Sequence, residues 1–209
     1  MTARPQATPR GFGWAVMLLL GWLIAAYALA MVAAPGIRSA IVRTHLATLP
    51  LALVAHLVGG AAALALGALQ HNTPLRTRHL ALHRWCGRLY VVAVGIGGVA
   101  ALALAGSSVG GLVSHVGFGT LAVLWLGSTG MAYWHVRAGR LPAHRRWMVR
   151  SYALTFAAVT LRIYLPLALV AGLPYEPAYQ AIAWLCWVPN LLFVEWVLIP
   201  RLGATPVSG

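Results

Sequence analysis

Six long apolar segments constrain the fold of this chain more than any other feature. An α-helix rises 1.5 Å per residue, so each segment is long enough to cross the roughly 30 Å hydrocarbon core of a bilayer. Turn-forming residues, such as Pro35-Gly36 and Asn72-Thr73-Pro74, separate the segments. The sequence therefore predicts an all-α, polytopic transmembrane bundle of six helices that forms a single domain over residues 1–209. The predicted spans are residues 12–34, 46–69, 80–105, 112–135, 148–171 and 178–199.

The charge pattern predicts how these helices are oriented. The chain is 61% hydrophobic and 8% charged, which excludes a water-soluble domain with a polar shell. All 15 basic residues are arginine, and only Glu176 and Glu195 are acidic. Arg38, Arg43 and Arg162 fall on one side of the predicted bundle and the other arginines on the opposite side, so the positive-inside rule predicts that both termini are cytoplasmic.

This asymmetry is typical of a multi-pass membrane protein. We interpret residues 12–34 as a retained first helix, because the run is longer than the apolar core of a signal peptide. The arginines adjoin apolar spans, so the expected partner is the lipid bilayer and not nucleic acid. A homo-oligomer or a partner membrane subunit is compatible with this organisation.

A short polar pattern occurs twice, each time at the entrance of an apolar segment. It reads Arg-Trp, then a second Arg and a Tyr, and the two copies are Arg84, Trp85, Arg88, Tyr90 and Arg146, Trp147, Arg150, Tyr152. One interpretation is an interfacial anchor, because Arg, Trp and Tyr prefer the headgroup level. The other is a site, because ionisable residues in membrane helices are often functional. The anchor interpretation does not explain the adjacent histidines.

Four histidines occupy membrane positions that predict two pairs. In an antiparallel bundle His56 and His115 share the outer half, whereas His83 and His144 share the cytoplasmic half. Two stacked pairs of this kind are what bis-imidazole ligation of two b-type haems requires. Three of these histidines are followed one turn later by a glycine that would leave room for a flat ring, and these glycines are Gly60, Gly87 and Gly119.

Arginines near both pairs are candidates for binding the haem propionates. Guanidinium groups bind carboxylates bidentately. At the cytoplasmic side the candidates for propionates or an anionic electron donor are Arg84, Arg88, Arg145, Arg146 and Arg150, and in the outer half the candidate is Arg162. His83 and His144 match better in depth than His56 and His115, so the sequence predicts two haems, or one on the cytoplasmic side.

Other interpretations remain open. His79 lies one turn before His83, and with His144 these residues could hold a transition metal, although no carboxylate or thiolate is at hand to complete such a site. Without haem, the chain would be a transporter, a lipid- or metal-binding bundle, or an assembly or scaffold subunit. Glu195 could pair with Arg84, Arg88 or Arg150.

Two family resemblances add to these predictions. The stretches LHRWCGRLY, HRRWMVRSYALTFAAVTLRIYLP and WVPNLLFVEW resemble the bacterial membrane family called domain of unknown function 2306, from about Leu64 to Trp196. This resemblance implies a multi-pass protein of the bacterial inner (plasma) membrane, but it implies no established activity. More distantly, RHLALHRWCG followed by SHVGFG is similar to the cytochrome b-561 family.

The second resemblance implies a two-haem membrane oxidoreductase that passes electrons from a cytoplasmic donor such as ascorbate to an acceptor across the membrane. Its ligand pattern would map onto His56 with His115 and onto His83 with His144. This chain lacks the Lys-rich donor motif of that family, so the donor and the acceptor are both unknown.

Overall fold

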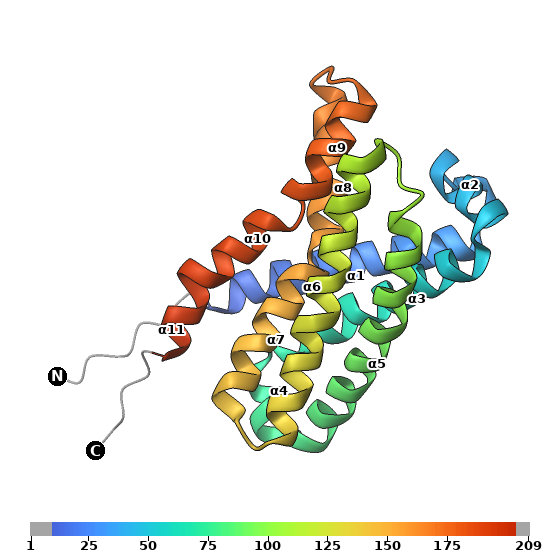
Figure 1. Cartoon of the computed structure of the whole chain (residues 1–209). Helices are drawn as coiled ribbons and strands as arrows, with labels where there is room; N and C mark the ends of the chain where they lie inside the picture. Colours follow the sequence, from blue (N-terminus) through green and yellow to red (C-terminus); the bar gives the residue numbers. More distant parts are fainter. Residues whose placement is uncertain (1–9, 204–209) are drawn as a thin grey trace, which may run out of the picture.

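The computed structural model describes residues 10–203, which are helical throughout and contain no strand (Figure 1). The long helices are α1 (Arg10–Ala33), α3 (Pro50–Gln70), α5 (Leu80–Ala105), α6 (Gly111–Arg137), α7 (Leu141–Thr155), α8 (Ala157–Val170) and α9 (Tyr175–Leu185). The shorter elements are η1 (Pro35–Ile37), α2 (Ala40–Thr48), α4 (Thr73–Arg78), α10 (Val188–Phe193), the π-helical turn η2 (Val194–Leu198) and α11 (Ile199–Gly203).

Six helical stretches of the described chain are long and apolar enough to cross a membrane, which confirms the prediction of six spans. They are Gly11–Ala33, Pro50–Gln70, Leu80–Ala105, Gly111–Arg137, Leu141–Val170 and Tyr175–Leu202. The second begins later than predicted. Residues 40–48 form the separate helix α2, which Ser39 caps by accepting a hydrogen bond from the Val42 N–H, and Pro50 then starts α3 at a position where its missing N–H costs nothing.

The fifth and sixth spans are each interrupted. The break between α7 and α8 follows Thr155, whose hydroxyl donates to the Ser151 carbonyl one turn earlier, a bond that often bends helices. The break after α9 precedes Pro189, which has no N–H to continue the ladder. The Asn190 side-chain nitrogen donates to the carbonyls of Ala153 (3.3 Å) and Cys186 (3.0 Å), so it bridges the two interrupted spans.

Helices α3 and α5 form the tightest crossing of the bundle because glycines lie where they meet. A Cβ atom at Gly59 would lie 2.8 Å from the Ala93 carbonyl oxygen and 2.9 Å from the Gly97 Cα. Without side chains at Gly59 and Gly97 the two backbones come into direct contact, as small residues allow in membrane bundles. This crossing fixes the position of His56, which lies one turn before Gly60 on α3.

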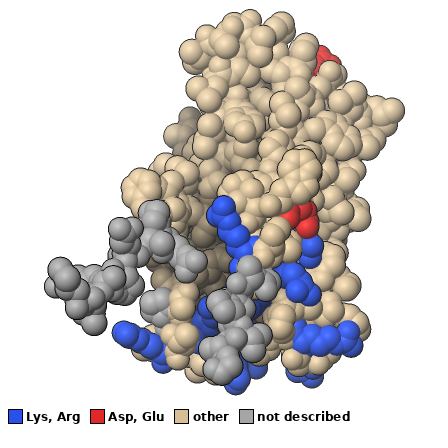
Figure 2. Space-filling model, turned by 90° about the vertical axis from the view of Figure 1, so that its left-hand side faces the viewer, with Lys and Arg blue, Asp and Glu red and all other residues tan. Residues whose placement is uncertain are grey.

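Arginines of the described chain gather at one end of the bundle, here called the arginine-rich end (Figure 2). It comprises α4, the start of α5, the α6–α7 connection and the start of α7. The opposite end carries α2 and the connection between α5 and α6 (Figure 1). The predicted cytoplasmic location of the arginine-rich end follows from the positive-inside rule, and Arg4 lies outside the described residues.

Candidate functional site

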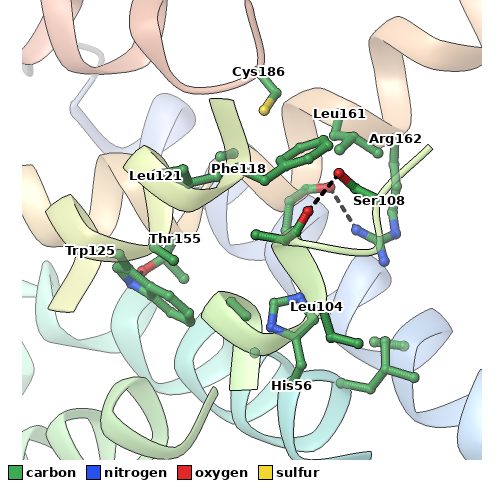
Figure 3. A pocket seen from close by; sticks show the side chains of 18 of the residues that line it. His56, Leu104, Ser108, Phe118, Leu121, Trp125, Thr155, Leu161, Arg162 and Cys186 are labelled. Atoms are coloured by element: carbon green, nitrogen blue, oxygen red, sulfur yellow. Dashed lines mark hydrogen bonds between the residues drawn. The ribbon is translucent and has the colours of Figure 1, made fainter. Parts of the chain in front are cut away.

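An apolar cavity of about 280 Å³ lies inside the bundle, nearer the end that carries α2. Three of the predicted cofactor residues, His56, Gly60 and Arg162, line it together. Figure 3 shows Arg162 and Ser108 on one side of this space and Trp125 and Thr155 on the other. Most of the remaining lining residues are aliphatic or aromatic, as in sites that bury the body of a ligand and orient it with a few polar groups.

The His56 imidazole is oriented by the helix crossing. Its Nδ1 lies 3.1 Å from the Gly97 carbonyl oxygen on α5. Since a carbonyl only accepts hydrogen bonds, Nδ1 carries the proton and Nε2 presents its lone pair. Nε2 has no hydrogen-bond partner among residues 10–203. A histidine that ligates a metal commonly donates its other ring N–H to a backbone carbonyl in this way.

Gly60 leaves space next to this imidazole. A Cβ atom built on Gly60 would have no neighbour within 4 Å, although the residue lines the cavity. This agrees with the clearance that the sequence pattern predicted at Gly60. Gly119, on α6, is not among the residues that line the cavity, and a Cβ atom there would be 4.0 Å from that of Ala105.

Arg162 brings a charge into the cavity that no carboxylate of the described chain neutralises. Its Nη1 donates to the Ala158 carbonyl (3.0 Å), and its guanidinium lies 5.5 Å from the ring centre of Tyr27. Among the described carboxylates, Glu195 pairs with Arg150 and Glu176 is exposed in the first turn of α9. An unpaired charge in apolar surroundings is costly, so the cavity is suited to a ligand with an anionic group.

The predicted partner of His56 does not face the cavity. His115 is not among the lining residues, and its Nε2 bonds instead to the Ser108 carbonyl (3.0 Å). His45 on α2 does line the cavity, although its position at the end of a predicted span indicated an interfacial or helix-capping residue. Both His45 nitrogens are occupied, Nδ1 by the Ile41 carbonyl (2.9 Å) and Nε2 by the Ser107 hydroxyl (3.1 Å).

The predicted cytoplasmic pair lies at the arginine-rich end among further histidines. His83 lies within electrostatic range of His144, whose Nδ1 donates to the Ala132 carbonyl (2.8 Å). In the amide orientation that satisfies both of its polar atoms, Gln70 donates to His83 Nδ1 (3.0 Å) and accepts from the Gly87 N–H (3.3 Å). A Cβ atom at Gly87 would meet Gln70 at 3.4 Å, so Gln70 fills the space predicted for a ring.

Two further histidines belong to this group, although their positions at helix ends indicated interfacial or helix-capping residues. His71 follows α3, and His135 lies in the last turn of α6; each has one buried ring nitrogen without a hydrogen-bond partner. His79 is exposed. Within residues 10–203 no three His, Cys, Asp or Glu side chains are placed to hold a metal ion together, so the structure does not assemble His79, His83 and His144 into a metal site.

The two Arg-Trp copies have the same local geometry. Arg88 lies over the Trp85 ring at 4.8 Å, and Arg150 lies over the Trp147 ring at 4.6 Å. Arg84, Arg88 and Arg146 are exposed. The exposed pair of Arg88 and Trp85 suits an interfacial anchor, whereas Arg150 and Trp147 are half-buried.

The prediction that Glu195 pairs with an arginine of these copies is confirmed for Arg150. Nε and Nη2 of Arg150 contact the two carboxylate oxygens at 2.5 and 2.9 Å. The pair joins α7 to the π-helical turn η2.

The tyrosines of the two copies point inward and carry polar contacts that the sequence did not reveal. The Tyr90 hydroxyl lies 2.7 Å from the Ser151 hydroxyl and 2.8 Å from that of Thr155, and Thr129 bonds to Ser151 (2.6 Å). The Thr129 hydroxyl also donates to the Trp125 carbonyl, and the Thr155 hydroxyl donates to the Ser151 carbonyl. These five contacts share four hydroxyl protons, so one contact lacks a proton in any arrangement. The network reaches the cavity wall at Thr155 and Trp125.

The buried position of His71 predicts a pH-dependent stability. Burial lowers the pKa of His71 from 6.5 to about 4 in the folded protein, with smaller contributions from Arg76 and His83. The unfolded chain gains this proton near pH 6.5 but the folded chain only near 4. The contribution of the neutral His71 ring to the free energy of unfolding is therefore complete above pH 6.5. It is lost as the pH falls toward 4, and the loss is at most about 3 kcal/mol.

The measurement is the thermal unfolding midpoint of the detergent-solubilised protein at pH 7 and pH 5. We expect His71→Gln to reduce the loss of stability between these pH values. The exposed His79→Gln should retain the wild-type loss. An unchanged pH dependence in His71→Gln would contradict this role of His71.

Comparison with known proteins bears on the family of the chain. No curated protein matches it, and no solved structure matches it. A family model described as a predicted membrane protein, DUF2306, matches residues 53–198, which include the long helices from α5 to α9 and most of α3. The match covers more than half of the chain and includes most residues that line the cavity, every histidine except His45, and both Arg-Trp copies. The chain therefore belongs to the DUF2306 family of predicted membrane proteins.

Proposed function

We propose that this membrane protein binds a b-type haem in the cavity, with His56 as an axial ligand, and transfers electrons within the bilayer. The observation that carries the proposal is the convergence of His56, Gly60 and Arg162 on one apolar intramembrane space. Haem would supply the one-electron chemistry. In a bacterium the protein would lie in the inner membrane with its arginine-rich end toward the cytoplasm.

The residues of the cavity fit such a group in three respects. The Gly97 carbonyl fixes the His56 ring in the tautomer that has a lone pair on Nε2. Gly60 leaves the adjoining helix surface open. Arg162 can pair with a carboxylate through the guanidinium N–H groups that do not bond to Ala158. The aliphatic walls would exclude water from all three.

The cavity offers one imidazole nitrogen without a hydrogen-bond partner, that of His56, because His45 has both nitrogens engaged and His115 faces Ser108. The proposal therefore places one haem here, with His56 as its histidine ligand. The proposal includes no haem between His83 and His144, because Gln70 lies in the space that the sequence predicted for a ring next to Gly87. The electron donor and acceptor are not specified by the cavity.

The test is the reduced-minus-oxidised absorption spectrum of the purified protein, combined with a pyridine haemochrome assay. We expect a Soret band in the wild type that His56→Ala reduces at least about tenfold. His115→Ala is the matched control and should retain the cavity haem. A colourless wild-type preparation from haem-replete cells would refute the proposal, and retention of all haem by His56→Ala would refute the assigned ligand.

A second candidate function is the binding of an anionic lipid-like molecule, and two observations favour it. No second unengaged histidine lines the cavity, and Arg162 alone supplies an uncompensated charge among apolar walls. Mass spectrometry of lipids extracted from purified wild type and from Arg162→Gln distinguishes this function. An acidic lipid that co-purifies with a colourless wild type and is depleted in Arg162→Gln would support it.

A further inference from the structure

Helix α2 forms the wall of the cavity at the end of the bundle that carries it. Ile41, Val42 and His45 line the cavity, and His45 is buried with 7% of its surface exposed. On the opposite face of α2, Arg43 and Thr44 are exposed. The other helices that line the cavity belong to the six candidate spans, whereas α2 belongs to none. Of the described helices around the cavity, α2 can therefore move with the least disturbance of the bundle.

One hydrogen bond ties α2 to the connection between α5 and α6. His45 Nε2 lies 3.1 Å from the hydroxyl of Ser107, which follows α5. His45 Nδ1 donates to the Ile41 carbonyl (2.9 Å), so in the neutral ring Nε2 accepts the Ser107 proton. Within residues 10–203, the other hydrogen bonds of α2 stay inside the helix or reach its flanking residues. Without the Ser107 contact, α2 would be held in place by the apolar packing of Val42 and Leu46.

Non-helical residues flank α2 at both ends. Arg38 and Ser39 are extended, and Leu49 leaves helical geometry with φ −137° and ψ 55°. Gly36 lies before them, and a Cβ atom there would have no neighbour within 4 Å. Residues at the ends of elements commonly absorb the changes in φ and ψ when a segment opens or closes. Helix α2 can therefore rotate as a unit while α1 and α3 stay in place.

We propose that α2 is a lid that opens the cavity to water at this end of the bundle, with the bond between His45 and Ser107 as its latch. The structure is the closed state. Opening gives a ligand a path to His56 and Arg162 that does not cross between the spans. Ser107 is exposed, so water can replace His45 as its partner when the lid opens. The lid concerns access to the cavity and not the identity of the ligand, so it does not depend on haem.

The experiment measures access to the cavity with a thiol reagent. Leu53→Cys places a thiol on α3 at a position that is buried and lines the cavity. The probe is a methanethiosulfonate with a trimethylammonium group, whose charge keeps it out of lipid, and the full-length protein is held in nanodiscs of phosphatidylcholine. The chain without this substitution gives the background, because Cys86 and Cys186 are both buried. Mass spectrometry of the intact protein gives the rate of modification.

We expect Ser107→Ala to raise the modification rate of the Leu53→Cys protein about tenfold, because it removes a hydrogen bond that exists only in the closed state. Thr48→Ala is the matched control, since the Thr48 hydroxyl lies on the same helix but donates within it, to the Thr44 carbonyl (3.0 Å). This control should keep the original rate. An unchanged rate in Ser107→Ala overturns the proposal, and so does an equal rise in Thr48→Ala, which would show general loosening of α2.

A second measurement uses the chain without Leu53→Cys, so that a folding defect of that variant cannot decide the result. Hydrogen–deuterium exchange, followed by mass spectrometry, reports how often the amides of residues 40–48 open. We expect Ser107→Ala to accelerate exchange in these residues and to leave α3 unchanged. Unchanged exchange in residues 40–48 would show that the latch does not hold α2, and this outcome overturns the lid.

Discussion

Replacement of Gly59 by leucine is expected to disrupt the bundle. The added Cβ would meet backbone atoms at 2.8 to 2.9 Å, namely the Ala93 carbonyl oxygen and the Cα and nitrogen of Gly97. Backbone cannot rotate away as a side chain can, so α3 and α5 would have to separate. Overpacking of a core costs about 1–3 kcal/mol when neighbours can adjust, and we expect the upper end of this range or more. The measurement is the thermal unfolding midpoint in detergent.

The matched control for this prediction is Gly95→Leu. Gly95 lies on α5 near the same crossing, but a Cβ atom there would have no neighbour within 4 Å. We expect this variant to unfold within a few degrees of the wild type. If Gly59→Leu were as stable as Gly95→Leu, the close contact between α3 and α5 would not exist in the protein.

Replacement of the adjacent Gly60 by leucine is expected to have the opposite consequence, with folding retained and ligand binding lost. The new side chain would enter open space beside the cavity and compete with the ligand for the helix surface next to His56. We expect haem content, measured as Soret absorbance per protein, to fall at least about tenfold. The unfolding midpoint of the ligand-free protein should fall little, because the leucine meets no neighbour.

Gly60→Ala is the graded control, since one methyl group occupies far less of the cavity. It should retain most of the haem. Full haem content in Gly60→Leu would mean that the ligand does not lie against this face of α3, and His56 would then have to bind it from another direction or not at all.

The sequence predicted the residues of the candidate site better than it predicted which residues they contact. The sequence predicted that Glu195 pairs with Arg84, Arg88 or Arg150, and the structure contains the pair with Arg150. His56, Gly60 and Arg162 were predicted for one haem and do line one cavity. The sequence did not predict that His45 lines the cavity or that His115 lies outside its lining.

The physical reason for this difference is the composition of the helices. In a soluble protein a polar stripe shows which face of a helix points outward. In a membrane helix the lipid-facing and the buried faces are both apolar, so the rotation of each helix about its axis leaves little trace in the pattern. Only the packing of the helices against one another decides this rotation. The same holds for glycines, since Gly59 touches α5 whereas Gly60, one residue later, faces open space.

The sequence by itself determined the membrane location, the six spans and the end at which the arginines gather, because each depends on composition along the chain. The tertiary structure decided which polar groups meet. It joined Tyr90 of α5 to Ser151 and Thr155 of α7, and it directed His56 to a carbonyl of α5. These contacts depend on close approach between helices, which glycine contacts and helix breaks set and which no periodicity in the sequence records.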